Sequence, residues 1–233
     1  MTGAIPPELA NLGALVALYL GGNNLTESIP PEIGNLQNLK YLGLSANSLT
    51  GSIPPEIGNL RNLGLLLLGQ NSLAGSIPAE IGNLANLYHL NVVANDLTGT
   101  IPPELSNLQR LVFLDLGSNR LAGTIPPEIG NLANLRQLLL GGNHLGGPIP
   151  PEIGNLANLI NLSLDGPANR PGLTGPIPPE IGNLRNLSLL GLSYNELSGP
   201  IPPEIGNLRK LSVLLLELDR PVRTGPAGTR QPP

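Results

Sequence analysis

The chain of 233 residues has no cysteine and no tryptophan, and it has only five aromatic side chains, four Tyr and one Phe. The absence of cysteine excludes disulfide bonds, thiolate metal sites and cysteine nucleophiles. Charged residues make up 12% of the chain and the net charge is −4, which excludes a basic nucleic-acid-binding surface. No apolar run approaches the roughly 18–20 residues that cross a membrane, and no signal peptide is visible at the start.

Glycine and proline are abundant instead, with 30 Gly and 26 Pro, and they recur at fixed positions. The octet IPPEIGNL at residues 29–36 returns along the whole chain, and its first isoleucine recurs every 24 residues, with one step of 28. These isoleucines are Ile5, Ile29, Ile53, Ile77, Ile101, Ile125, Ile149, Ile177 and Ile201. A period of this length, combined with L-x-x-L-x-L-x-x-N-x-L spacing, is typical of a leucine-rich-repeat solenoid.

The alternation of side chains predicts one short strand per repeat unit, or coil. In the segment LYHLNVVANDL (87–97), Leu90 and Val92 share one face, whereas His89, Asn91 and Val93 share the other. The leucine face is expected inside, and the other face is expected to line an exposed parallel sheet about 40 Å long. Each buried aliphatic side chain contributes roughly 1.5–3 kcal/mol, so the stack is stable although a single coil is not.

Each predicted strand ends at an asparagine, at the point where the chain turns inward. An amide both donates and accepts hydrogen bonds, so a column of asparagines can satisfy buried backbone groups of adjacent coils. This predicted structural ladder consists of Asn23, Asn47, Asn71, Asn95, Asn119, Asn143 and Asn195. The Pro-Pro pair of the octet favours a short 3₁₀ or irregular segment, because proline cannot donate a hydrogen bond to a strand ladder.

Nine of the sixteen acidic residues are the glutamate of the octet, one in each coil. They are Glu8, Glu32, Glu56, Glu80, Glu104, Glu128, Glu152, Glu180 and Glu204. We interpret this glutamate ladder as a solubilising face rather than a cation-binding surface. The octet is therefore the framework of the fold, not a chemical site in many copies.

The unit L-x-x-L-x-L-x-x-N-x-L-[TSA]-G-x-I-P-P-E-[IL]-G-N-L resembles the plant-type leucine-rich repeat of receptor-kinase ectodomains and polygalacturonase-inhibiting proteins, over about residues 1–216. The resemblance implies an α/β horseshoe of about nine coils, with a parallel sheet on the concave face and short 3₁₀ or irregular segments on the convex face. It also implies a second short strand at L-T-G-x-I-P. A protein, peptide or small ligand would be held on the concave face.

Two departures from the family pattern concern the ends. Family ectodomains usually carry terminal caps with paired cysteines, which this chain lacks, and MTGAIPPEL aligns with LTGSIPPEI (49–57), so the chain begins within a coil. We expect a fragment, a truncated gene model or a cysteine-free relative. The resemblance implies an extracellular or cell-surface location, although no signal peptide is visible, and the compartment stays open.

The variable positions of the strands are where ligand specificity is expected. A contiguous patch of mixed chemistry runs over coils two to six, and exposed aromatics beside polar groups favour a protein-binding surface. The predicted patch consists of Tyr41, Leu65, Leu67, His89, Asn91, Phe113, Asp115, Gln137 and Leu139, with Tyr88 and Arg136 at its margin. The alternative is neutral variation of exposed positions in a duplicated array.

Four extra residues lie in LSLDGPANRPGLTG (162–175) and displace Asn169 from the asparagine ladder. Insertions at coil corners form surface loops that often take part in binding, so Asp165, Asn169 and Arg170 are candidate ligand contacts. A tolerated insertion without a role is the alternative.

Enzyme chemistry is not expected. Strand geometry separates His89 from Asp115 by about 8 Å, too far for a direct hydrogen bond, and Ser163 lies two coils beyond Asp115, so no triad forms. His144 is interpreted as a solvated corner residue. No clustered ligands predict a metal or any other cofactor. Sequons at Asn24, Asn161 and Asn186 permit glycosylation without indicating secretion.

The repeat pattern stops after residue 216, and residues 217–233 are rich in Pro, Gly and Arg. We predict a solenoid over 1–216 and a disordered tail or linker over 217–233. Coils without polar caps leave apolar edges that favour self-association.

The leading interpretation is a non-catalytic recognition module that binds a protein or peptide partner. In this interpretation the module is the ligand-binding part of a receptor-like protein. A structural or self-associating scaffold is one alternative. Ice binding is another, suggested by TGS (50–52) and TGT (98–100). It needs a regular column of hydroxyl residues, which Ala74, Ala122, Gly146, Pro148, Pro176 and Pro200 interrupt.

Overall fold

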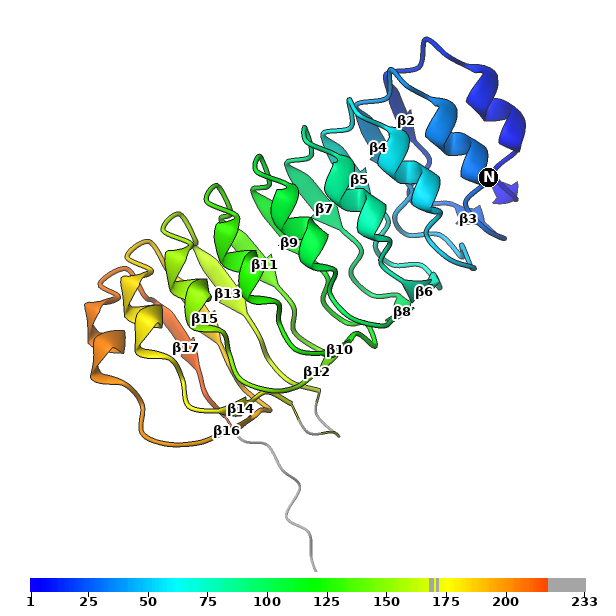
Figure 1. The fold of residues 1–233 in the computed structure, drawn as a ribbon. Coiled ribbons are helices and arrows are strands. Elements are labelled where there is room, and N and C mark those ends of the chain that lie inside the picture. The colour runs from blue at the N-terminus through cyan, green and yellow to red at the C-terminus, as the bar shows by residue number, and fades with distance from the viewer. Residues whose placement is uncertain (168–169, 171, 218–233) are drawn as a thin grey trace, which may run out of the picture.

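The chain forms a curved stack of coils in the computed structural model, which describes residues 1–167, 170 and 172–217 (Figure 1). We number the coils one to nine from the N-terminus, each beginning at a repeat leucine or at Met1, so that coil four is 73–96 and coil five is 97–120. Figure 1 shows strands along one side of the stack and short helical turns along the other. The predicted α/β leucine-rich-repeat solenoid is confirmed.

One parallel sheet of nine strands runs through the described coils in chain order. Its strands are β2 (Ala17–Tyr19), β4 (Tyr41–Gly43), β5 (Leu65–Leu67), β7 (His89–Asn91), β9 (Phe113–Asp115), β11 (Gln137–Leu139), β13 (Asn161–Ser163), β15 (Leu189–Gly191) and β17 (Val213–Leu215). Neighbours pair in steps of 24 residues, and the pairing of Asn161 with Leu189 is a step of 28. The insertion therefore leaves the register of the sheet unchanged.

A 3₁₀ helix lies opposite each strand. These helices are η1 (Pro7–Asn11), η2 (Pro31–Asn35), η3 (Pro55–Asn59), η4 (Ala79–Asn83), η5 (Pro103–Asn107), η6 (Pro127–Asn131), η7 (Pro151–Asn155), η8 (Pro179–Asn183) and η9 (Pro203–Asn207). Proline is favoured at the first helical position because its fixed φ suits the turn and its missing N–H has no partner there. All nine helices except η4 begin at such a proline.

The second short strand implied by the family resemblance is present, but the described part of the chain shows it as four separate pairs along one edge of the stack (Figure 1). The pairs are β1 (Thr2–Gly3) with β3 (Asn24–Leu25), β6 (Ala74–Ser76) with β8 (Asp96–Thr98), β10 (Ala122–Gly123) with β12 (His144–Leu145), and β14 (Thr174–Gly175) with β16 (Glu196–Leu197). Isolated bridges from Ser28 to Thr50 and from Ser52 to Ala74 extend the same edge.

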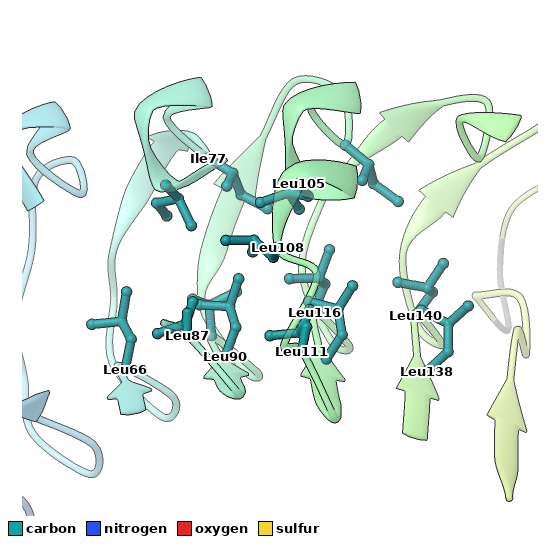
Figure 2. Packing of buried hydrophobic residues seen from close by; sticks show 14 of the residues in the cluster. Leu66, Ile77, Leu87, Leu90, Leu105, Leu108, Leu111, Leu116, Leu138 and Leu140 are labelled. Atoms are coloured by element: carbon teal, nitrogen blue, oxygen red, sulfur yellow. The ribbon is translucent and has the colours of Figure 1, made fainter. Parts of the chain in front are cut away.

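The core is a set of aliphatic columns that run between the sheet and the 3₁₀ helices (Figure 2). Leu90 and Leu114 are fully buried in one column, as the strand alternation predicts. The column ends at Leu214 in coil nine, which is 40% exposed. Leu18, at the other end of the column in coil one, is still buried, so the column is open at its C-terminal end.

Seven of the nine octets contain a glycine that allows close stacking of the helical turns, and coils one and five have Ala10 and Ser106 in its place. A Cβ atom at Gly58 would lie 2.5 Å from the carbonyl oxygen of Glu80 and 2.6 Å from its Cβ atom. At Gly206, in the last described coil, such an atom would meet nothing within 4 Å. Gly58 is therefore closely fitted to the neighbouring coil, whereas Gly206 has no such neighbour.

Among the described residues, no helix has both the length and the apolar character needed to cross a bilayer. The predicted tail falls mainly on residues 218–233, which lie outside the described residues, so the boundary at 216 stays a prediction.

Candidate functional site

The asparagines at the strand ends form a hydrogen-bonded ladder through coils one to six, and Asn195 makes the same contacts in coil eight. Asn95 is representative: its Oδ1 accepts from the Leu73 amide at 2.9 Å, and its Nδ2 donates to the carbonyls of Leu68 and Val92 at 3.1 and 3.0 Å. The preceding residue of the turn, Ala94, has a positive φ of 54°. Asn95 thus joins its own coil to the preceding coil and keeps the strands of the two coils in register.

A second amide ladder lies at the other end of the strands, and the sequence analysis missed it. Its members donate from Nδ2 to a carbonyl oxygen of the previous coil at 2.8–3.0 Å. They are Asn38, Asn62, Asn86, Asn134, Asn158 and Asn186. The repeated N-L-x-N-L spacing was the signal that could have identified it. In coils five and nine, Arg110 and Lys210 replace the asparagine and donate to Asn86 and Asn186 instead.

The variable strand positions form two exposed columns on the concave sheet. Parallel pairing places each residue beside its counterpart in the next coil, so that His89 pairs with Phe113 and Asn91 pairs with Asp115. Through coils two to six, the first column reads Tyr41, Leu65, His89, Phe113 and Gln137, and the second reads Gly43, Leu67, Asn91, Asp115 and Leu139. The predicted strand residues therefore lie together on one face.

Aromatic stacking orders two parts of this face. The rings of His89 and Phe113 stack with their centroids 4.1 Å apart, and the rings of Tyr19 and Tyr41 lie 6.5 Å apart at an interplanar angle of 16°. Burial lowers the pKa of the His89 imidazole, which favours its neutral form. The N-terminal half of the face is thus rich in aromatic and aliphatic side chains.

Tyr88 and Arg136 both precede a strand and border the columns. Tyr88 is 40% exposed, and its ring covers the space beside Gly64, where a Cβ atom would lie 2.8 Å from the Tyr88 Cε1 atom. Burial, followed by the charges of Tyr41 and Tyr19, raises the Tyr88 pKa. Arg136 is exposed, and its backbone carbonyl accepts from the amides of Ile160 and Asn161.

Asp115 is the charged centre of the face. Its side chain is oriented by a hydrogen bond from the Gly117 amide to Oδ1 at 3.0 Å, and the residue is only 8% exposed. Burial raises the pKa of its carboxyl group, and the Gly117 hydrogen bond partly opposes that shift.

The insertion places a second carboxylate near the end of the next strands. Asp165 Oδ2 accepts from the Ser163 hydroxyl at 2.7 Å, and Oδ1 accepts from the Ser193 amide at 2.9 Å. Among the described residues, neither Asp115 nor Asp165 forms an ion pair. Arg170 is exposed, and its amide donates to the Pro167 carbonyl at 3.3 Å. Asn169 lies outside the described residues.

The small-residue floor beside these carboxylates was not predicted. A Cβ atom at Gly141 would lie 2.9 Å from the Ser163 hydroxyl, and one at Gly117 would lie 3.2 Å from Asp115 Oδ1. A larger residue at either glycine would therefore crowd the Asp115 carboxylate or the Ser163 hydroxyl that donates to Asp165. No group of three or more His, Cys, Asp or Glu residues in the described part of the chain is arranged to hold a metal ion.

Comparisons with known proteins agree with this architecture. The family model described as "Leucine-rich repeat region" matches residues 3–116, and the model described as "Leucine Rich Repeat" matches residues 110–132, 134–156 and 186–208. A comparison with curated protein sequences finds no match.

Three similar solved structures are from plants. The peptide hormone receptor RGFR1 in complex with RGF2 is 39% identical, with a TM-score of 0.79 over 93% of this chain and 38% of the receptor chain. The Arabidopsis receptor kinase HAESA, in complex with the peptide hormone IDA and the co-receptor SERK1, is 39% identical, with a TM-score of 0.86 over 92% and 36%. A plant ice-binding protein is 31% identical, with a TM-score of 0.78 over 93% and 68%.

The chain spans a little over a third of the length of the two receptor chains. The family models together cover most of the repeat units, and the ice-binding protein is more than 30% identical over two thirds of its own length. The chain belongs to the leucine-rich-repeat family, and its structural neighbours include plant receptor-kinase ectodomains.

Proposed function

We propose that the concave face binds an extended peptide or protein segment that carries a basic group, and that the chain is the ligand-binding part of a receptor-like protein. The observation that carries this proposal is that one face combines stacked aromatic side chains with Asp115 and Asp165, two carboxylates that form no ion pair with any described residue. RGFR1 is a peptide hormone receptor and HAESA is in complex with a peptide hormone, which supports a peptide as the class of ligand.

The sheet itself limits how a ligand can bind. The backbone groups of the inner strands are paired with neighbouring strands, so a ligand cannot join the sheet as a further strand there. It must contact side chains across successive coils. Aromatic anchors such as Phe113 typically contribute 2 kcal/mol or more to such interfaces, whereas Asp115 and Asp165 select a cationic group.

A library of displayed linear peptides selected against the purified chain tests the proposal. We expect enrichment of sequences with a lysine or arginine beside an apolar or aromatic residue. The selected peptide should bind Phe113→Ala and Asp115→Asn at least tenfold more weakly, and should bind the convex control Glu128→Gln with unchanged affinity. Unchanged affinity for both concave variants would refute the proposal.

Ice binding is a second candidate, supported by one specific column of residues. At the x position of L-T-G-x-I-P, five successive coils carry an exposed hydroxyl residue: Ser28, Ser52, Ser76, Thr100 and Thr124. Parallel bridges and strand pairs at this edge join Ser28 to Thr50, Ser52 to Ala74 and Ser76 to Thr98, so the hydroxyl residues of the column follow the edge but are offset by two residues from coil to coil. Thermal hysteresis that disappears in Thr100→Tyr would favour this candidate, and its absence in the unmodified chain would reject it.

Self-association through the end coils would support the scaffold alternative. Leu214 is 40% exposed, and Tyr19 on the edge strand at the other end is 60% exposed. Edge strands with apolar side chains favour pairing between chains. Sedimentation of the polypeptide at increasing concentration tests this, and a monomer at every concentration would count against it.

A further inference from the structure

The convex side of coil four carries the one break in the Pro-Pro-Glu repeat. Each of the nine octets contains two prolines before its glutamate except in coil four, where Ala79 follows Pro78. The exception changes the surface around it. The first proline of the pair is buried in every coil from two to nine except coil four, where Pro78 is half-buried.

A hollow of about 660 Å³ lies at this position, between the β6–β8 pair and the beginnings of η3, η4 and η5. Its sides are formed by the rings of Pro55 and Pro103, and Ala79 lies between them in coil order. Three exposed hydroxyl residues, Ser52, Ser76 and Thr100, line one edge. A proline ring at residue 79 would occupy part of this space, so the alanine of coil four leaves the hollow wider.

Glu80 and Glu104 supply the charge of the hollow. Neither glutamate forms an ion pair with the described residues, and no cationic residue lines the hollow. The lining therefore combines apolar proline rings, hydroxyl acceptors and two negative charges from successive coils. A side chain with an apolar stem and a cationic head matches this combination, because the stem can lie on the rings while the head reaches the carboxylates. A guanidinium can contact two carboxylates through its separate N–H groups.

We propose that the hollow at Ala79 binds an arginine side chain presented by a second protein. The proposal is independent of the concave face, which lies on the opposite side of the coils (Figure 1). Glu80 and Glu104 would accept hydrogen bonds from the guanidinium. Pro55 and Pro103 would contact the methylene groups of the arginine.

The chain offers a variant that narrows the hollow without disturbing the fold. Pro78 has φ −68° and ψ 135°, within the range of the equivalent prolines that precede a proline, such as Pro54 with φ −69° and ψ 131°. This backbone conformation is the one that a following proline requires. Ala79→Pro therefore restores the repeat pattern and fills the part of the hollow beside residue 79.

The test is a titration of the isotope-labelled chain, followed by NMR, with N-acetyl-arginine amide as the probe and its neutral isostere N-acetyl-citrulline amide as the control. We expect saturable shifts of the Ser76 and Ala79 amide signals with the arginine probe only. Ala79→Pro should abolish the shifts at Ser76. Glu80→Gln combined with Glu104→Gln should weaken binding at least fivefold.

A matched pair, Glu128→Gln combined with Glu152→Gln, changes the net charge equally but lies outside the hollow. It should leave the affinity unchanged. Equal shifts with the citrulline probe would indicate a neutral occupant and overturn the proposal. Shifts that persist in Ala79→Pro, or that weaken equally in both glutamate pairs, would also overturn it. Failure here leaves the peptide selection on the concave face unaffected, because the two experiments use different variants.

Discussion

Replacement of Asn95 by alanine tests the energetic role of the asparagine ladder. Its Oδ1 atom is the acceptor for the Leu73 amide, for which no backbone acceptor is found among the described residues. Its Nδ2 atom donates to the Leu68 and Val92 carbonyls, and each of these carbonyls also accepts from a second ladder residue, Asn71 or Asn119. Alanine thus leaves one buried N–H without a partner and removes one of two donors from each carbonyl.

The cost follows from these contacts. A buried N–H left without a partner costs about 1–3 kcal/mol, and each lost hydrogen bond to a carbonyl that keeps another donor costs about 0.5–1.5 kcal/mol. The sum predicts a loss of about 2–6 kcal/mol for Asn95→Ala. In the second ladder, Asn86→Ala removes a single bond to the Arg61 carbonyl and one acceptor of Arg110 at an exposed position. That variant should lose only about 0.5–1.5 kcal/mol.

Urea unfolding monitored by circular dichroism measures both losses. Both variants remove an asparagine side chain, one from each ladder. The difference between their losses of unfolding free energy therefore reports the number and burial of the hydrogen bonds removed. Equal losses in Asn95→Ala and Asn86→Ala would refute the reasoning. A loss below about 1 kcal/mol for Asn95→Ala would do so as well.

Three further predictions concern stacking, the turn at residue 79 and the concave histidine. Gly58→Ala should destabilise the chain by about 2 kcal/mol or more because its Cβ atom would overlap Glu80. Gly206→Ala, with nothing within 4 Å of the added Cβ atom, should be neutral or stabilising by about 0.4–1 kcal/mol. Equal effects of the two variants in urea unfolding would contradict the stacking role of the octet glycine. Ala79→Pro should stabilise the chain by about 0.4–1 kcal/mol because proline restricts the unfolded chain at a compatible position, and a lowered midpoint of thermal unfolding would show that the turn of coil four differs from the others. His89 has a folded pKa below its unfolded value of 6.5, so the unfolded chain binds more protons between these two values. The contribution of His89 to stability is therefore complete above pH 6.5 and is lost as the pH falls towards the folded pKa. His89→Phe should reduce this pH dependence of the free energy of unfolding. An unchanged slope of that free energy against pH would exclude His89 as its source.

The repeating part of the fold could be predicted because each coil has the same spacing of apolar residues. The 24-residue spacing of Ile77, Ile101 and Ile125 fixes the coil length, and the alternation around Leu90 fixes which side chains enter the core. Hydrophobic periodicity is the strongest signal in a sequence, and a period repeated nine times leaves little ambiguity.

The features that were missed depend on contacts between coils. The second amide ladder has a clear period, but its function appears only when Asn86 is placed beside the Arg61 carbonyl of the previous coil. The hydrogen bonds of Asp165 to Ser163 and Ser193 likewise follow from how the insertion crosses the stack. The hollow at Ala79 is widened by a missing proline ring, which appears in the repeat pattern only as a mismatch.

The concave strand residues could be assigned to one face, but their ligand could not be predicted. Pairing places His89 beside Phe113, and the strand pattern contains that information. The close approach of Gly117 to the Asp115 carboxylate depends on the stacked coils instead. The strand pattern therefore gives the location of the surface, and the proposed preference for a basic group rests on side-chain packing that the pattern does not contain.

A crystal structure of the chain bound to a peptide selected from the displayed library is the most direct test of the account. We expect the peptide to cross β7, β9 and β11, with an apolar side chain against Phe113 and a basic group at the carboxylate of Asp115. A peptide seated on the 3₁₀ helices of the convex side, with the concave strands uncovered, would contradict it.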